Sequence, residues 1–280
     1  MEQKWTTVIK PNKKKIDFNL KELAQYKDLI YMFVKRNFTS QYKQTVLGPL
    51  WFVLNPLLTS FISTVVFGGI AGIQTGEVPY FLFYLCGFML WSYFSTCVTQ
   101  TSATFTGNAG IMGKVYFPRL TMPIATVIYS MINTVIIFVM TVITMIIYVA
   151  NGMEISIDWH ILLIPVLFIQ TALLGMGVGI VVSSLTTKYR DLAVLVTFGL
   201  QLWMYITPVV YPVSQLSEKF RQIIMLNPMS PVISNLRYAM FGMGEFEWTY
   251  WLVSIGVTLL ILFFGVGLFG KVEKTFMDTV

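Results

Sequence analysis

Few side chains in this sequence are of the types that carry nucleophilic, acid–base or metal chemistry, and their spacing does not bring them together. The two cysteines, Cys86 and Cys97, lie eleven residues apart in one apolar stretch. On a helix that separation is roughly 16 Å, too far for a disulfide, so we expect both thiols to be free. The one histidine, His160, stands beside Asp158 and Trp159 at the end of an apolar stretch, where we favour a structural role over a proton shuttle or ligand. Two cysteines alone predict no metal site.

A nucleotide-binding loop is also not indicated. Lys114 follows Gly113, but a P-loop requires a glycine five residues before Gly113 and a serine or threonine after the lysine. The sequence has Asn108 and Val115 at those positions. We therefore expect no cofactor bound by this chain.

Glycines recur inside the apolar stretches. Gly175, Gly177 and Gly179 lie in the middle of one of them, and Gly68 and Gly72 lie near the end of another. Small residues at such positions let helices approach closely within a membrane. We interpret both groups as packing positions.

Six long stretches contain no Asp, Glu, Lys or Arg, at 44–76, 78–113, 120–153, 161–187, 192–217 and 248–270. A helix needs about 20 apolar residues to cross a hydrocarbon core of about 30 Å. The sequence thus predicts an all-α integral membrane protein with six transmembrane helices, near 49–72, 79–101, 122–150, 159–185, 192–212 and 248–270. Because these stretches lack carboxylates, ion-coupled transport and membrane-embedded acid–base catalysis are both disfavoured.

The basic residues predict the orientation of the chain. If both termini are cytoplasmic, 16 of the 19 Lys and Arg fall on the cytoplasmic side and three on the outer side. This partition follows the positive-inside rule, whereas the inverted topology violates it. The net charge of +6 is then explained by orientation and by attraction to anionic lipids, and nucleic-acid binding is not favoured.

The chain divides into a basic cytoplasmic tail (1–18), an amphipathic interface helix (19–43), the transmembrane domain (44–272) and a cytoplasmic C-terminus (273–280). At 100° per residue the interface helix gathers its apolar side chains on one side. They are Leu20, Leu23, Tyr26, Ile30, Phe33, Val34 and Phe38. The helix either serves only as an anchor in the membrane interface or also meets a partner subunit.

The segment 212–247, between the fifth and sixth predicted spans, is the one long outer connection. Its centre is mostly apolar but is interrupted by Asn227, Pro228 and Pro231, and it is too short to cross the membrane twice. We predict two short helices that form a re-entrant hairpin in the outer leaflet.

Two cytoplasmic loops combine charge with turn-forming residues. One runs from Gly107 to Pro123 and has the size of a short helix parallel to the membrane, and the other is the turn from Lys188 to Asp191. Each either fixes the topology or contacts a partner that supplies energy, because the spans themselves carry no group for ion coupling.

Several short motifs together resemble one known family. They occur in order over about residues 20–272 and comprise Lys35-Arg36, Tyr42, Thr45, Leu47-Gly48, Trp51, Asn55-Pro56, Phe117-Pro118, Tyr189-Arg190-Asp191-Leu192, Thr207-Pro208, Tyr211-Pro212, Asn227-Pro228 and Arg237. With six spans and a re-entrant segment before the last, the chain resembles the ABC-2-type permeases that export bacterial polysaccharides such as O-antigen, capsule and teichoic acid.

The resemblance implies a homodimer in the bacterial inner membrane that works with two copies of a separate ATPase, which binds ATP and Mg. It implies coupling to the ATPase through Lys114, Tyr116, Arg119, Arg190 and Asp191. The first and fifth spans would line the translocation path, with Trp51, Phe52, Phe61, Phe67, Phe198, Trp203 and Tyr205 upon them. The family's order of motifs also suggests an outer gate at Tyr211, Asn227, Pro228 and Arg237.

The composition of the path suits a glycan. Aromatic residues make up 15% of the chain, and sugars offer apolar C–H faces to aromatic platforms and hydroxyls to neutral polar groups. At the inner mouth, Arg36, Tyr42, Lys43 and Gly48 form a predicted portal for a polyprenyl pyrophosphate, since basic groups pair strongly with phosphate. Simple positive-inside anchoring explains these basic residues equally well.

Two other functions stay open at this point. A permease of the same architecture for a drug or a small lipid would use the same coupling loops. A membrane-embedded enzyme or scaffold would stimulate no ATPase.

Overall fold

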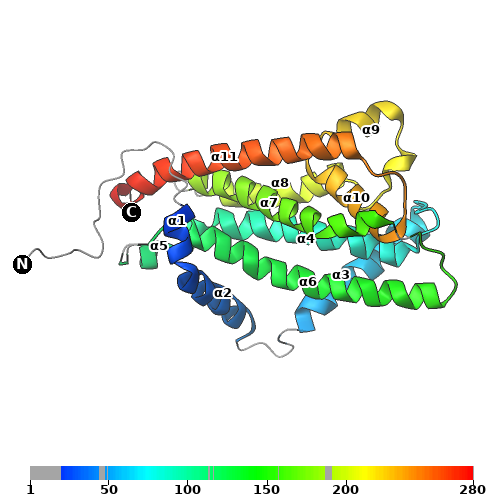
Figure 1. Ribbon diagram of the computed structural model, residues 1–280, viewed down its shortest axis with the longest axis horizontal. Coiled ribbons are helices and arrows are strands. Elements are labelled where there is room, and N and C mark those ends of the chain that lie inside the picture. Colours follow the sequence, from blue (N-terminus) through cyan, green and yellow to red (C-terminus); the bar gives the residue numbers. More distant parts are fainter. Residues whose placement is uncertain are drawn as a thin grey trace, which may run out of the picture.

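The protein is an elongated bundle of helices (Figure 1). The computed structural model describes residues 20–43, 48, 50–112, 114–115, 117–156, 158–186 and 191–279, and all regular elements in these ranges are helical. The short helix α5 (Thr104–Met112) and the last turns of α11 (Trp248–Thr279) lie at one end of the bundle. Helix α9 (Glu218–Met225) lies at the opposite end. We call these the α5 end and the α9 end.

Five helical segments in the described ranges are long and apolar enough to cross a membrane. They correspond to α3 (Leu50–Ser63) with the π-helical η1 (Thr64–Ile70), α4 (Tyr80–Ser102), α6 (Thr121–Ala150), η2 (Trp159–Leu163) with α7 (Ile164–Thr186), and most of α11. The prediction of a multi-pass helical membrane protein is therefore confirmed. These five segments coincide with five of the six predicted spans.

The predicted fifth span is shorter than expected. It forms α8 (Leu192–Ile206), an apolar helix of 15 residues. Thr207 is extended, with φ −94° and ψ 141°, because the ring of Pro208 disfavours a helical conformation in the residue before it. A helix of this length measures roughly 22 Å, less than a hydrocarbon core of about 30 Å, so the six-span topology stays a prediction.

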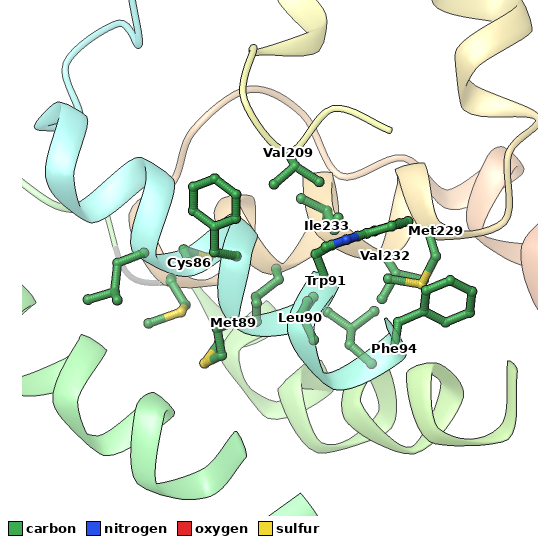
Figure 2. Close-up of a cluster of buried hydrophobic side chains, with 14 of the residues drawn as sticks. Cys86, Met89, Leu90, Trp91, Phe94, Val209, Met229, Val232 and Ile233 are labelled. Carbon is green, nitrogen blue, oxygen red and sulfur yellow. The ribbon is translucent and has the colours of Figure 1, made fainter. Parts of the chain in front are cut away.

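Helix α4 is the centre of the bundle. In its most apolar window 78% of the residues are buried inside the protein, compared with 11% for α3 and η1. Figure 2 shows side chains of α4 meeting Val209, which follows α8, and side chains of α10 (Met229–Phe241). The labelled residues of this core are Cys86, Met89, Leu90, Trp91, Phe94, Val209, Met229, Val232 and Ile233.

The glycines of α7 allow close contact with its neighbours, as predicted. A Cβ atom at Gly179 would lie 2.6 Å from Cβ of Thr101 on α4, and one at Gly175 would lie 2.7 Å from Cβ of Cys97. Gly68 likewise faces the ring of Tyr80. The prediction for Gly72 is wrong: a Cβ there would meet nothing within 4 Å, and its φ of +66° is a left-handed conformation after η1 that glycine adopts readily.

The segment predicted as an interface helix is helical in two pieces, α1 (Leu20–Gln25) and α2 (Lys27–Tyr42), separated at Tyr26, and its position at the membrane interface stays a prediction. Phe33 and Val34 on its apolar face are buried in a cluster with Phe105 of α5 and Tyr129 of α6. The apolar face is thus used largely for packing against the protein. The basic tail at 1–18 lies outside the described residues, and α11 continues as one helix through the predicted boundary at 272.

The segment 212–247 contains the two predicted short helices, with the turn at Asn227 and Pro228. They differ in their surroundings. Helix α10 is largely buried against α4, α7 and α11, whereas α9 exposes Phe220 and Ile223 at the tip of the bundle. The expected position of this hairpin in the outer leaflet stays a prediction.

Candidate functional site

Arg237 of α10 joins three parts of the α9 end. Its Nη1 donates a hydrogen bond to the backbone oxygen of Pro208 at 2.6 Å, and Nη2 donates to that of Val209 at 2.6 Å. A longer contact of 3.4 Å reaches the backbone oxygen of Phe83, whose ring lies 3.5 Å from the guanidinium carbon. Arg237 is only 3% exposed, so its charge is held by carbonyl dipoles and an aromatic face.

Space for the guanidinium is provided by a glycine. A Cβ atom at Gly87 would lie 2.5 Å from Nη2 of Arg237 and 2.9 Å from the backbone oxygen of Val209. Pro208 ends α8, so the carbonyls at 208 and 209 have no helical partner and are free to accept. Glycine on α4 and proline after α8 together make the arginine site possible.

Asn227 connects α8 with the turn before α10. Its Oδ1 accepts hydrogen bonds from Nε1 of Trp203 at 3.0 Å and from the backbone N–H of Met229 at 3.2 Å. Its Nδ2 donates to Oγ1 of Thr207 at 2.8 Å. The ring of Trp203 packs edge-on against Phe94 of α4 at a centroid distance of 5.2 Å. The amide therefore fixes the position of the end of α8 relative to α10.

A second polar chain runs through α7 and α11 to the same turn. Nε1 of Trp251 donates to Oε1 of Gln170 at 2.6 Å, and Nε2 of Gln170 donates to Oγ of Ser254 at 2.7 Å. Ser254 in turn donates to the backbone oxygen of Pro228 at 2.6 Å. In an apolar environment such bonds are strongly preferred to unpaired polar groups, so the turn is held from two sides.

The surface of the α9 end is held by an ion pair and by aromatic rings. Arg221 of α9 pairs with Glu247, and this hydrogen bond raises the pKa of Arg221 above its usual value. His160, which the sequence assigns to a structural role, bonds Asp158 at 2.7 Å and stacks near Trp159 and Phe246. The hydroxyl of Tyr211 donates to the backbone oxygens of Tyr205 and Ile206 at the end of α8, both at 3.3 Å.

The aromatic residues predicted for the path separate into two groups. Half or more of each side chain is exposed for Trp51 and Phe61 on α3 and for Phe198 and Tyr205 on α8. Phe67 and Trp203 instead contribute to the core around α4. The side chain of Phe52 lies outside the described residues.

At the α5 end, Arg36 of α2 donates from Nη2 to Oδ1 of Asn108 on α5 at 3.2 Å. Lys43 is exposed and Gly48 adopts a left-handed φ of +48° just before α3. The side chain of Tyr42 lies outside the described residues. Of the predicted portal, Arg36 is therefore the residue with a defined side-chain contact, and this contact joins α2 to α5.

The structure describes three of the predicted coupling residues, Lys114, Arg119 and Asp191. Lys114 is exposed just after α5, and Arg119 is partly buried just before α6. Asp191 is exposed at the N-terminus of α8 and makes no side-chain cap bond there. Tyr116 and Arg190 lie outside the described residues. The loop from Gly107 to Pro123 contains a helix, as predicted, although α5 begins three residues earlier.

The sequence reasoning missed a polar cleft of about 390 Å³ between α3, α4 and α6. Its walls include Gln41, Gly48, Trp51, Asn55, Ser92, Thr96, Gln100, Tyr129, Ser130, Asn133 and Thr134. A signal was available, because polar residues recur at helical spacing in an otherwise apolar α6, at 126, 130, 133, 134 and 141.

These features define a polytopic helical membrane protein with exposed faces on α3 and α8. The turn at Asn227 and Pro228 is held by hydrogen bonds at the α9 end, and charged side chains are exposed at the α5 end. Comparison with known proteins identifies the family. Residues 28–241 match the model of the ABC-2 type transporter family, and the chain belongs to that family.

Relatives agree over nearly the whole chain. It is 30% identical over 265 residues to an O-antigen export system permease protein RfbA of Klebsiella pneumoniae, covering 94% of this chain and 98% of the relative. The RfbA protein of Myxococcus xanthus is 28% identical over 77% of this chain and 81% of its own length. The polysialic acid transport protein KpsM of Escherichia coli is 20% identical over 87% of this chain and 93% of its own length.

Proposed function

We propose that this chain is the permease subunit of an ATP-driven exporter that moves a polyprenyl-pyrophosphate-linked polysaccharide of the O-antigen kind out of the cytoplasm. The observation that carries this proposal is the 30% identity to an O-antigen export permease over 98% of that protein. The spans contain no carboxylate for ion coupling, so the energy comes from a separate ATPase.

The working unit is a dimer of this chain with two copies of the ATPase. Helices α3 and α8 support this arrangement because both leave large apolar and aromatic side chains exposed. Two such helices from each copy, facing each other, form a conduit with aromatic walls. The exposed residues Trp51, Phe61, Phe198 and Tyr205 offer rings on which the C–H faces of sugars slide without tight binding.

In the membrane, α8 acts as a short fifth span and the hairpin of α9 and α10 fills the remaining depth of the outer leaflet. Both termini are then cytoplasmic in the inner membrane, in agreement with 16 of 19 basic residues on that side. The α5 end faces the cytoplasm and the α9 end faces outward.

Coupling to the ATPase takes place at the α5 end. Lys114 and Asp191 are exposed there, and Tyr116, Arg119 and Arg190 lie in the same two loops. Closure of the ATPase pair on ATP rotates the two permeases as rigid bodies, which requires contacts that differ between the two states. The outer gate is formed by the hydrogen-bonded turn at Asn227 and Pro228 together with Tyr211 and Arg237.

Deletion of the gene in its native host tests the proposal. The expected result is loss of surface polysaccharide and accumulation of undecaprenyl-linked polymer inside the cell, with both reversed by the wild-type gene. An unchanged polymer would exclude polysaccharide export and favour a drug or small lipid as the cargo. If no ATPase encoded nearby binds this chain or is stimulated by it, a membrane-embedded enzyme or scaffold is favoured instead.

A further inference from the structure

The cleft between α3, α4 and α6 is lined by uncharged polar groups. Its described lining contains hydroxyls, amides and three aromatic side chains, and no Asp, Glu, Lys or Arg is among them. It extends from Gly48 before α3 to Ile137 near the middle of α6. A polar wall at this depth in a membrane protein is costly unless something fills its hydrogen-bonding capacity.

Among the polar atoms of this wall, several lack a hydrogen-bond partner within the described residues, and two of them carry the argument. They are the hydroxyl of Tyr129, whose residue is only 2% exposed, and Oδ1 of Asn133 one turn further along α6. Both residues line the cleft. Buried polar groups are normally paired, so an unpartnered hydroxyl and an unpartnered amide oxygen facing one cleft point to a bound polar molecule.

The cleft continues toward the cytoplasmic loops. A second cavity of about 270 Å³ shares Gln41, Gln100 and Tyr129 with it and reaches Arg36 and Asn108. Together the two cavities follow α6 from Met122 to Ile137, roughly 22 Å along the helix. The two cavities therefore form one continuous path lined by neutral hydrogen-bonding groups, with Arg36 at its cytoplasmic entrance.

The other side of α6 is different in kind. There, a groove of about 480 Å³ is lined almost entirely by aliphatic side chains, among them Ile132, Val135 and Ile169. Lipid tails suffice to cover such a surface. The contrast between the two sides of one helix indicates that the polar side is built for a ligand other than a lipid chain.

We infer that this cleft binds the sugar residues nearest the pyrophosphate of the lipid-linked glycan before they enter the conduit, with Arg36 meeting the phosphate. This inference rests on the proposed function and adds a loading site on the flank of each copy. Neutral hydroxyl and amide groups pair with sugar hydroxyls and release them easily, and the arginine favours the anionic end. The Arg36–Asn108 bond joins this mouth to α5, so movement of α5 by the ATPase would open or close it.

Site-specific photocrosslinking in cells that make the polymer tests the inference. Benzoylphenylalanine is placed at Ser92 or Thr96 in the cleft, at Ile132 in the aliphatic groove as the matched control, and at Phe198 on α8 for the conduit. The ATPase carries a substitution that prevents hydrolysis, so that the substrate stays loaded. Crosslinked permease is then probed with an antibody against the polymer.

The expected result is polymer attached through positions 92 and 96 but not through position 132. Tyr129→Phe and Asn133→Leu should each reduce this crosslinking about two- to tenfold, the equivalent of one lost hydrogen bond. Val135→Leu on the aliphatic side should leave it unchanged. The amount of permease–ATPase complex recovered in mild detergent shows whether each variant folds.

Absence of polymer at both cleft positions, in cells whose export depends on this chain, overturns the loading site. Equal capture at position 132 overturns it as well. Polymer captured only at position 198 would overturn the loading site but leave the proposed export function intact. If deletion of the gene changes no polymer at all, the export function itself fails, and the two failures are thereby distinguished.

Discussion

Arg237 donates a 2.6 Å hydrogen bond to the backbone oxygen of Pro208, the residue whose ring ends α8. The arginine thus occupies the place where the backbone of α8 leaves its helix, and it supplies donors that the helix can no longer provide. The same guanidinium reaches α4 through Phe83. A single side chain therefore holds α4, α8 and α10 in register.

Arg237→Met should strongly destabilise the protein. It leaves the backbone oxygens of Pro208 and Val209 without donors, and hydrogen bonds to charged groups are worth about 1.5–3 kcal/mol each. The thermal midpoint in mild detergent should fall clearly, and surface polysaccharide should fall with it. Arg221→Met, a change of the same type at the exposed α9 surface, should lower the midpoint much less. Equal effects of the two variants would contradict the assigned role of Arg237.

Asn227 and Trp203 should behave as a coupled pair. Asn227→Leu removes the acceptor of Trp203 Nε1 and the donor to Thr207, and Trp203→Phe removes only the indole N–H. Because the two side chains share a hydrogen bond, the loss in thermal midpoint of the double variant should be smaller than the sum of the single losses. Additive losses in detergent would show that the bond contributes nothing to the position of α8.

Close packing of α4 on α7 can be tested with a single methyl group. Gly179→Ala places a Cβ 2.6 Å from that of Thr101 and 2.9 Å from the backbone oxygen of Val98, so the two helices must separate. Overpacking of this kind costs typically about 1–3 kcal/mol. Gly256→Ala on α11 is the control, since a Cβ there meets nothing within 4 Å. A thermal midpoint unchanged by Gly179→Ala would contradict the close approach.

Substitution at the second cytoplasmic loop should separate ATP hydrolysis from export. Asp191 is exposed and its side chain caps nothing, so Asp191→Asn removes a charge with little effect on α8. We expect Arg190→Ala and Asp191→Asn to leave the complex with the ATPase assembled and hydrolysing ATP while export falls. ATP hydrolysis is measured as phosphate release, and export is measured as polymer reaching the surface. Export at the wild-type level would count against a coupling role for this loop.

Much of the fold follows from the composition of the stretches between charged residues. The five spans, the turn at Asn227 and the glycine contacts of α7 could be predicted because length, proline and small residues act locally. The end of α8 was placed too late in the sequence. Pro208 forces Thr207 out of the helix, and this shortens the predicted span.

The direction in which each side chain points was harder to predict from the sequence. Phe67 and Trp203 resemble their exposed neighbours in the sequence but are partly buried against the core, because α4 and the turn at Asn227 face them. The sequence places Arg237 on the outer side, and the resemblance suggests a gate there, but neither predicts its hydrogen bonds to the carbonyls of Pro208 and Val209. The cleft at Tyr129 and Asn133 is formed by three helices. The sequence alone shows only the polar residues at helical spacing on α6, not the other two walls.

Reconstitution in vesicles tests the central claim most directly. The chain is purified with the ATPase encoded beside it and inserted into vesicles loaded with lipid-linked polymer in the outer leaflet, with the ATP-binding subunits facing out. The account predicts that polymer becomes protected inside only when ATP and the ATPase are both present. Transport against a gradient by this chain alone, without ATPase or nucleotide, would contradict it.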